Sequence, residues 1–239
     1  MRISDKAILL QTIKHGDKKY ILKLYTLNHG FIIASAIAGA TPKSKIKFSA
    51  LLPLNLLDVE LVVKQNNDVQ QLNEVSCYYV TTTINTSLNK LSIALFLNEV
   101  LIKSLKEQAP NAHLYSFIET CIKFLNTSES NFINLHLYFL IKLTKYLGIE
   151  PKNNFDKNFC FFDCREGQFT SYSLSFPLGL NAEESVLLSV FLKTNNLNIT
   201  INHAQRQQLL NVLLVYYSFH IPNFKNLKSL AVLQEIVMV

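Results

Sequence analysis

The sequence predicts an α+β protein with more than one domain, in which a small β-barrel precedes a mainly α-helical part. In residues 1–80 apolar and polar side chains alternate with a period of two, whereas from residue 88 onward the apolar side chains recur at helical spacing. The charge is equally uneven, because residues 1–50 hold nine Lys or Arg and two acids, a net charge of +7 in a chain whose total is +6. This asymmetry predicts a polyanionic partner for the first domain.

Five short strands are expected in the first domain, residues 1–80. They fall at residues 7–12, 20–26, 31–38, 59–63 and 75–79, with turns such as 14–19 and 28–30 between them. Five strands with turn-rich connections in so few residues are typical of a closed barrel of the OB type, a fold that binds oligonucleotides. A β-sandwich would show a similar alternation.

The second domain, residues 81–239, is expected to consist mainly of helices. Its first helix would bury the following residues on one face: Leu88, Leu91, Leu95, Ile102 and Leu105. A stripe of apolar residues between positions 114 and 125 predicts a second helix. The segment 132–147 is apolar nearly all round, which predicts a central, buried helix that ends at Gly148.

Two asparagines, Asn181 and Asn202, precede apolar segments and are expected to cap two further helices. The first of these helices would bury the following residues: Val186, Leu187, Val190 and Phe191. Residues 227–237 are expected to add one short helix at the end.

An irregular insert at about residues 152–180 contains Cys160 and Cys164. Structural zinc needs about four ligands, usually as two close pairs. Only this one pair is present, because Cys77 and Cys121 fall on apolar faces. His203 is a conceivable third ligand beside Cys160 and Cys164, but nothing supplies a fourth, so we expect neither a metal nor a cofactor. Four cysteines in a chain of this length do not form a disulfide framework and are expected to be reduced.

None of the common catalytic motifs is present in the sequence. It has no G-x-G-x-x-G, no G-x-x-x-x-G-K-[ST], no H-E-x-x-H and no G-x-S-x-G. His136 lies in the apolar helix and is expected to be a hydrogen-bonded core residue, and His220 is expected to make a packing or capping contact. We therefore expect a protein that is not an enzyme. A nuclease or other hydrolase is an alternative, against which the lack of a carboxylate cluster beside the basic stretches counts.

The first fifty residues carry both ingredients of single-stranded nucleic-acid binding, namely cations for phosphates and aromatic rings for bases. Tyr20, Tyr25 and Phe48 are interleaved with lysines. Seven lysines are expected to contact phosphates: Lys14, Lys18, Lys19, Lys23, Lys43, Lys45 and Lys47. Tyr25 is the expected stacking residue because it shares a strand face with Lys23, while Tyr20 is expected in the core. No residue in this region is identified as a hydrogen-bonding partner for base edges, so binding is expected not to depend on the nucleotide sequence.

Several short motifs follow one another along the chain. They are Leu24-Tyr25-Thr26 with Gly30, Ala38-Gly39-Ala40 with Lys43-Ser44-Lys45, Leu51-Leu52-Pro53-Leu54, Leu147-Gly148-Ile149-Glu150-Pro151, Tyr216-Tyr217-x-x-His220, and Phe224-Lys225-x-Leu227-Lys228-Ser229-Leu230-x-Val232-Leu233. In this order and spacing they resemble the RecO family, the recombination mediators of bacterial DNA repair. The resemblance runs from one end of the chain to the other. It implies an N-terminal OB domain, a helical domain and, in many members, a four-cysteine zinc module that is degenerate in this sequence.

The resemblance also implies a function and a set of partners. Such proteins bind single-stranded and double-stranded DNA, anneal complementary strands and, with RecR, help load RecA onto DNA coated by the single-stranded-DNA-binding protein SSB, whose C-terminal tail they bind. An RNA-binding or translation-associated OB protein is the alternative that the composition leaves open. No signal peptide or membrane span is visible in the sequence, so we expect a cytoplasmic, nucleoid-associated protein with no membrane partner.

Overall fold

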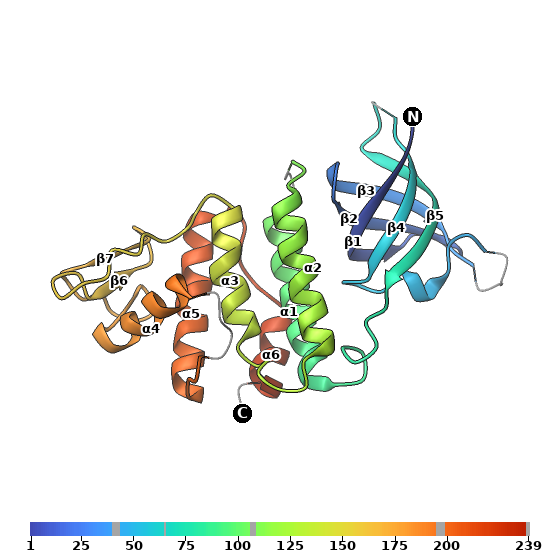
Figure 1. The fold of residues 1–239 in the computed structure, drawn as a ribbon. Coiled ribbons are helices and arrows are strands. Elements are labelled where there is room, and N and C mark those ends of the chain that lie inside the picture. The colour runs from blue at the N-terminus through green and yellow to red at the C-terminus, as the bar shows by residue number, and fades with distance from the viewer. Residues whose placement is uncertain (40–43, 65, 106–108, 195–198, 238–239) are drawn as a thin grey trace. The chain divides into compact units, whose positions relative to one another are not determined.

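The computed structural model describes residues 1–39, 44–64, 66–105, 109–194 and 199–237. The chain forms two compact units, shown in Figure 1. One consists of Met1–Ser87 with Asn98–Thr127, and the other of Leu88–Leu97 with Ser128–Val239. Helix α1 (Leu88–Ser104) contributes residues to both units.

The first unit contains a closed five-stranded barrel, drawn in blue to cyan in Figure 1. Its strands are β1 (Arg2–Lys14), β2 (Lys19–Thr26), β3 (Gly30–Ile37), β4 (Leu56–Val62) and β5 (Val69–Tyr79), and the 3-10 helix η1 (Phe48–Ala50) lies between β3 and β4. The strands close in the order β1-β2-β3-β5-β4, with β3 parallel to β5 and the other neighbours antiparallel. This arrangement confirms the predicted fold class, an OB-type barrel followed by helices.

The alternation of side chains explains which residues lie inside the barrel. Leu22 and Leu24 of β2 point inward and are fully buried. Some outward side chains of β1 and β2 are buried as well, because helices of the same unit cover this side of the barrel. The ring of Tyr25 stacks on Tyr115 of α2 (Ala112–Thr127) at 6.4 Å between centroids, and Asn98 of α1 donates to the Leu10 carbonyl at 2.8 Å.

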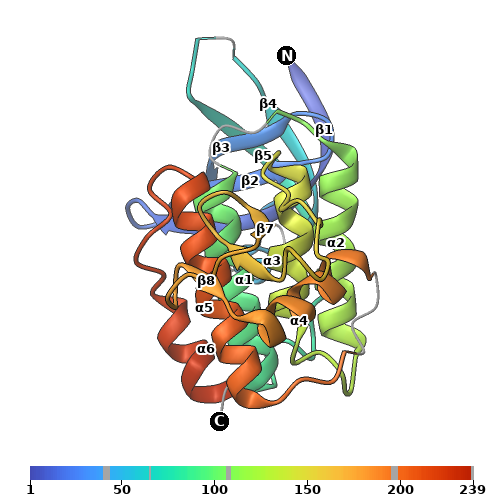
Figure 2. The same ribbon diagram turned by 90° about the vertical axis from the view of Figure 1, so that its left-hand side faces the viewer.

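The second unit is built around a buried helix. Its elements are α3 (Leu135–Tyr146), the strands β6 (Phe161–Asp163), β7 (Gln168–Thr170) and β8 (Gly179–Leu180), and the helices α4 (Ala182–Lys193), α5 (His203–His220) and α6 (Ser229–Val237). Helix α3 packs against α4 and α5 and is buried nearly all round, as its composition predicts (Figure 2). It ends before Gly148, whose φ of +72° is the left-handed conformation that glycine adopts most easily.

Two helix faces differ from those expected. On α1, Leu88 and Leu95 are 71% and 41% exposed and the buried face carries Ile93, Phe96, Leu97, Val100 and Leu101, whereas Leu105, directly after the helix, is buried as expected. On α4, Val186 and Val190 are exposed and Leu188 is fully buried, whereas Phe191 is buried as expected. Both helices carry apolar residues on more than one side, so a helical period fits several faces equally well and tertiary contacts decide which one is buried.

Within the described ranges, no helix has the length and apolar character that crossing a bilayer requires.

Candidate nucleic-acid interface

The hairpin between β1 and β2 presents three of the expected lysines. Lys14 is the last residue of β1, Lys18 lies in the turn, Lys19 is the first residue of β2, and all three are exposed. The His15 N–H donates to the Lys19 carbonyl at 2.8 Å and closes the turn. Gly16 has a φ of +113°, which residues with a side chain rarely adopt, so the tip depends on glycine at this position.

The second basic stretch lies beside this hairpin. The Ala38 N–H donates to the Lys18 carbonyl at 3.0 Å, and the Gly39 N–H donates to the Ile46 carbonyl at 3.0 Å. These two bonds bring the segment that carries Lys45 and Lys47 to the end of the barrel where β2 begins. Both side chains are exposed. Lys43, the seventh expected contact, lies outside the described residues.

A groove of about 390 Å³ lies where the two stretches meet. Its lining residues are Lys19, Ser35, Ala36, Ile37, Lys45, Ile46, Gln71, Leu72 and Asn73. It thus combines two ammonium groups with amide and hydroxyl groups and with Ile37, which is 70% exposed. Lys45 also lies 3.1 Å from a carboxylate oxygen of Glu74. Because both side chains of this ion pair are largely exposed, the pair is weak and leaves Lys45 available to a polyanion.

Lys23 lies apart from the hairpin tip, in the middle of β2. It is half-buried and is paired with Gln11 of β1 and Ile33 of β3. Ile33 is in turn paired with Val69 of β5. Lys23 therefore lies on the outer surface of β2 beside β3, and OB folds bind oligonucleotides on the face of their second and third strands.

Tyr25 is not an exposed stacking residue, and this expectation is corrected. Its ring is fully buried, and burial raises the pKa of its hydroxyl to about 12. Sequence alternation gave the correct face, since Tyr25 points away from the barrel interior. The covering helix α2 could not be foreseen from the strand itself, because it is contributed by residues almost ninety positions later in the chain.

An exposed ring lies instead at the basic end of the barrel. Phe48 directly follows Lys47, is 42% exposed, and packs edge-on against Tyr20 with 5.5 Å between ring centroids. Tyr20 is partly buried against the barrel core, as predicted, and its ring packs against Phe48. Phe48 directly follows the lysine-rich stretch that ends at Lys47, and this adjacency was the sequence signal for an aromatic ring beside the lysines.

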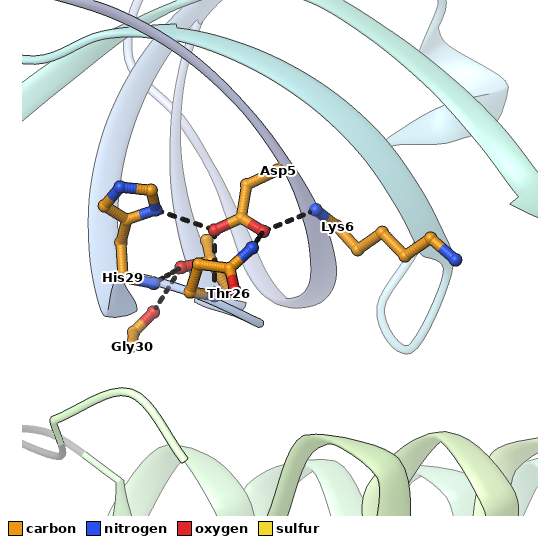
Figure 3. Close-up of polar contacts among 6 residues, drawn as sticks. Asp5, Lys6, Thr26, His29 and Gly30 are labelled. Atoms are coloured by element: carbon orange, nitrogen blue, oxygen red, sulfur yellow. Dashed lines mark hydrogen bonds and ion pairs between the residues drawn. The ribbon is translucent and has the colours of Figure 1, made fainter. Parts of the chain in front are cut away.

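Of the two acids in the first fifty residues, Asp17 lies in the basic hairpin, whereas Asp5 is used in a turn away from it. Figure 3 shows that the Asp5 carboxylate accepts hydrogen bonds from the Lys6 N–H at 2.8 Å and contacts the His29 ring at 2.8 Å. It also accepts from the backbone and side-chain N–H groups of Asn28. Its side chain is fully buried and fixes the turn between β2 and β3, at the opposite end of these strands from Lys19. Asp5 therefore serves this turn and makes no ion pair with the described lysines of the hairpin.

The insert does not fit a zinc site. The thiol of Cys164 is buried and donates to the Leu178 carbonyl, and burial raises its pKa to about 11, whereas zinc requires a thiolate. Cys160 is half-buried. Among the residues that the structure describes, no three His, Cys, Asp or Glu side chains are grouped so that they could hold a metal ion.

Aromatic packing holds the insert to helix α5. Phe162 of β6 contacts Phe169 of β7 at 5.3 Å and Tyr216 of α5 at 6.1 Å between ring centroids. His220 packs on Tyr216 at 4.2 Å and its Nε2 lies 3.2 Å from the Cys164 carbonyl oxygen, which confirms the expected packing role.

A closed OB barrel with a basic groove, continued by a helical unit with a small aromatic-cored insert, defines a two-unit OB-fold protein. Two family models match this chain, Recombination protein O N terminal over residues 1–80 and Recombination protein O C terminal over residues 85–231. The chain belongs to the Recombination protein O (RecO) family.

Relatives named DNA repair protein RecO match nearly the whole chain. The protein from Flavobacterium johnsoniae is 32% identical over 99% of both chains. The protein from Christiangramia forsetii is also 32% identical over 99% of both chains, and that from Phocaeicola vulgatus is 29% identical over 96% of both. The resemblance inferred from the ordered motifs is thus confirmed at the level of the family.

Proposed function

We propose that this chain is a DNA repair and recombination mediator that binds single-stranded and double-stranded DNA through the basic end of its barrel, without sequence preference. The observation that carries this proposal is the groove where Lys19 and Lys45, from two separate segments, line one surface. Lysines at such a surface release condensed counterions from phosphates, which gives affinity without reading bases. The names of the relatives, DNA repair protein RecO, support DNA as the polyanion.

Annealing follows from this kind of binding. A protein that holds strands by their phosphates screens the repulsion between two strands and leaves the base edges free to pair. The proposed function includes cooperation with RecR in loading RecA onto SSB-coated DNA in the bacterial cytoplasm, at the nucleoid. In this proposal the chain acts by binding and not by catalysis, so labelled DNA incubated with the protein and magnesium is expected to remain intact.

The SSB tail, an acidic and apolar peptide, needs an apolar recess beside cations. The helical unit has such a recess, of about 380 Å³, between α5 and α6. Its lining residues are Leu214, Val215, Ser218, Phe224, Lys225, Asn226, Leu227 and Leu230. We assign the tail to this recess. Leu214→Asp is expected to abolish binding of a labelled tail peptide while DNA binding by the barrel remains, and unchanged peptide binding would remove this assignment.

The DNA site is tested with two charge-matched variants. Lys19/Lys45→Gln neutralises the groove, and Lys145/Lys193→Gln removes the same charge from exposed positions on α3 and α4. We expect the groove variant to bind single-stranded and double-stranded oligonucleotides at least tenfold more weakly and to anneal complementary strands more slowly. The helix variant is expected to behave like the wild type. Equal behaviour of the two variants would exclude the groove as the DNA site.

Phe48 is expected to distinguish single strands from duplexes. Stacking of a base on an aromatic ring contributes about 1–3 kcal/mol, and it requires an unpaired base. Phe48→Leu should therefore weaken binding of a single-stranded oligonucleotide about fivefold or more and leave duplex binding nearly unchanged, whereas Phe48→Tyr should preserve both. Equal losses for single strands and duplexes would show that Phe48 acts on the barrel structure and does not stack on bases.

A further inference from the structure

Exposed aromatic rings gather on the insert of the helical unit. In the described part of the chain the exposed Phe and Tyr residues are Phe48, Phe159, Tyr172, Phe176 and Phe219. All except Phe48 belong to residues 152–180 or contact them, since the guanidinium of Arg165 lies 5.4 Å from the centre of the Phe219 ring. Contiguous apolar patches on a protein surface, especially ones rimmed by polar groups, mark interaction sites.

Two of these rings line a pocket of about 490 Å³. Its lining residues are Lys152, Asn154, Asp156, Phe159, Gln168, Phe169, Thr170, Ser171 and Tyr172. Phe159 is 42% exposed and Tyr172 is 51% exposed, while Phe169 is only 1% exposed and belongs to the aromatic core beneath. The pocket therefore has an aromatic lining with polar groups around it. In Figure 1 the β6–β7 hairpin that carries it projects beyond α5, on the side away from α3.

The pocket is held in shape by hydrogen bonds that are already satisfied. The side-chain amide of Asn154 donates to the Phe169 carbonyl at 2.8 Å and accepts from the Phe169 N–H at 2.9 Å. Asp156 accepts from the Phe159 N–H at 2.9 Å, and the Tyr172 hydroxyl donates to Asp163 at 3.1 Å. The Phe159 backbone and the Tyr172 side chain are thus held in place before a ligand arrives, which lowers the entropic cost of binding.

The charges around the pocket select the kind of group that enters it. Lys152 and Asp156 both lie in the lining, so their formal charges cancel, and Lys157 and Arg165 are exposed on the same insert outside the pocket, where they could contact a phosphate backbone. The lining therefore has no net charge that would attract an anionic group. A neutral, flat group that can both stack and form hydrogen bonds with Gln168 and Ser171 suits this lining, and a nucleobase has these properties.

We propose that this pocket binds one unpaired base of single-stranded nucleic acid, packed against Phe159 and Tyr172, and that the insert is a second strand-binding site on the chain. The proposal rests on the proposed function, because it assigns to the same protein a site for a second strand. One chain could then hold two strands at once, one by its phosphates on the barrel and one by a base on the insert. In this account the aromatic insert binds nucleic acid without needing a metal.

The test uses a single-stranded oligonucleotide of twelve thymidines that carries one 2-aminopurine, together with the wild type and two variants. Phe159→Leu/Tyr172→Leu removes both rings and keeps apolar side chains, and Tyr172→Phe keeps the ring and removes only the hydroxyl. In the background of Lys19/Lys45→Gln, where barrel binding is weakened, we expect the double variant to bind at least fivefold more weakly and to lose the stacking-dependent quenching of 2-aminopurine. Tyr172→Phe should retain both, and far-UV circular dichroism of all variants should match.

Two results separate this inference from the proposed function. If the ring variants bind and quench like their parent while the lysine variant alone is impaired, the insert site is excluded and the barrel site stands. If the wild type binds no DNA, both are excluded. A single Phe159→Leu variant repeats the test and keeps the hydrogen bond between Tyr172 and Asp163. Because the Phe159 side chain is 42% exposed, its replacement should not disturb the fold. Unchanged quenching in this variant would likewise count against the pocket.

Discussion

His136 is a fully buried histidine for which neither ring nitrogen has a hydrogen-bond partner among the described residues. Its ring packs edge-on against Phe96 at 6.2 Å between centroids. His136 is thus the buried core residue that was expected, with an interaction to the Ile133 backbone that falls short of good hydrogen-bond geometry. Burying an unpaired polar group costs roughly 1–3 kcal/mol. His136→Leu is accordingly expected to raise the free energy of unfolding by about 1 kcal/mol or more at pH 7.5, as measured by urea denaturation, and a clear loss of stability would contradict this reading.

The same residue predicts a pH dependence of stability. Burial lowers the pKa of His136 from its ordinary value of 6.5 to about 3. Between pH 6.5 and pH 3 the histidine is protonated in the unfolded chain and neutral in the folded chain. His136 therefore does not reduce stability above about pH 6.5, and the free energy of unfolding falls as the pH drops from there toward 3. The loss is about 1.4 kcal/mol for each pH unit. The advantage of His136→Leu over the wild type should therefore be larger at pH 5 than at pH 7.5, and an equal advantage at both pH values would show that His136 is not the group responsible.

At the residue scale, sequence could assign a strand face but not what covers it. The alternation along β2 placed Tyr25 outside the barrel correctly, and α2 buries it. The sequence predicts the exposure of Phe48 less well, because Phe48 lies in a 3-10 helix, where side chains do not alternate between two faces. Only the three-dimensional packing of Phe48 on Tyr20 shows which ring of the basic region remains accessible.

At the scale of the element, helix starts were more predictable than helix faces. Asn181 accepts from the Glu184 N–H, and the Glu184 side chain accepts from the Asn181 N–H, which forms a complete capping box at the start of α4. Asn202 and Gln205 form the same box on α5. A cap depends on four neighbouring residues and can be read locally. The buried faces of α1 and α4 depend on distant contacts, which is why they match the expected faces only in part, at Leu105 after α1 and at Phe191 on α4.

The cap of α4 gives a prediction at this scale. Asn181→Ala leaves the Glu184 N–H without its acceptor and should lower the stability of the helical unit by about 1 kcal/mol. For a chain of this size that corresponds to a fall in Tm of roughly 2–4 °C by calorimetry. Asn181→Ser, which keeps a side-chain acceptor, is the matched control and should stay close to the wild type. Equal falls in Tm for both variants would mean that the cap does not contribute.

At the scale of the whole molecule, the order of a barrel and then helices could be predicted because the apolar period changes from two to helical spacing near residue 88. The basic region could be predicted from charge alone. The groove could not, because it depends on the hydrogen bonds of Ala38 and Gly39 that set the second lysine segment against the hairpin. The pocket in the insert had no sequence signal beyond its aromatic residues, which a packed core would explain equally well.

The central claim is that the barrel groove binds the phosphates of DNA, and the salt dependence of binding tests it most directly. Fluorescence anisotropy of a labelled single-stranded oligonucleotide, measured across a series of salt concentrations, gives the slope of log affinity against log salt for the wild type, Lys19/Lys45→Gln and Lys145/Lys193→Gln. Each phosphate contact on a single strand contributes about 0.7 to this slope, so the loss of two should reduce it by about 1.4 in the groove variant only. A steep slope that remains unchanged in the groove variant would contradict the account.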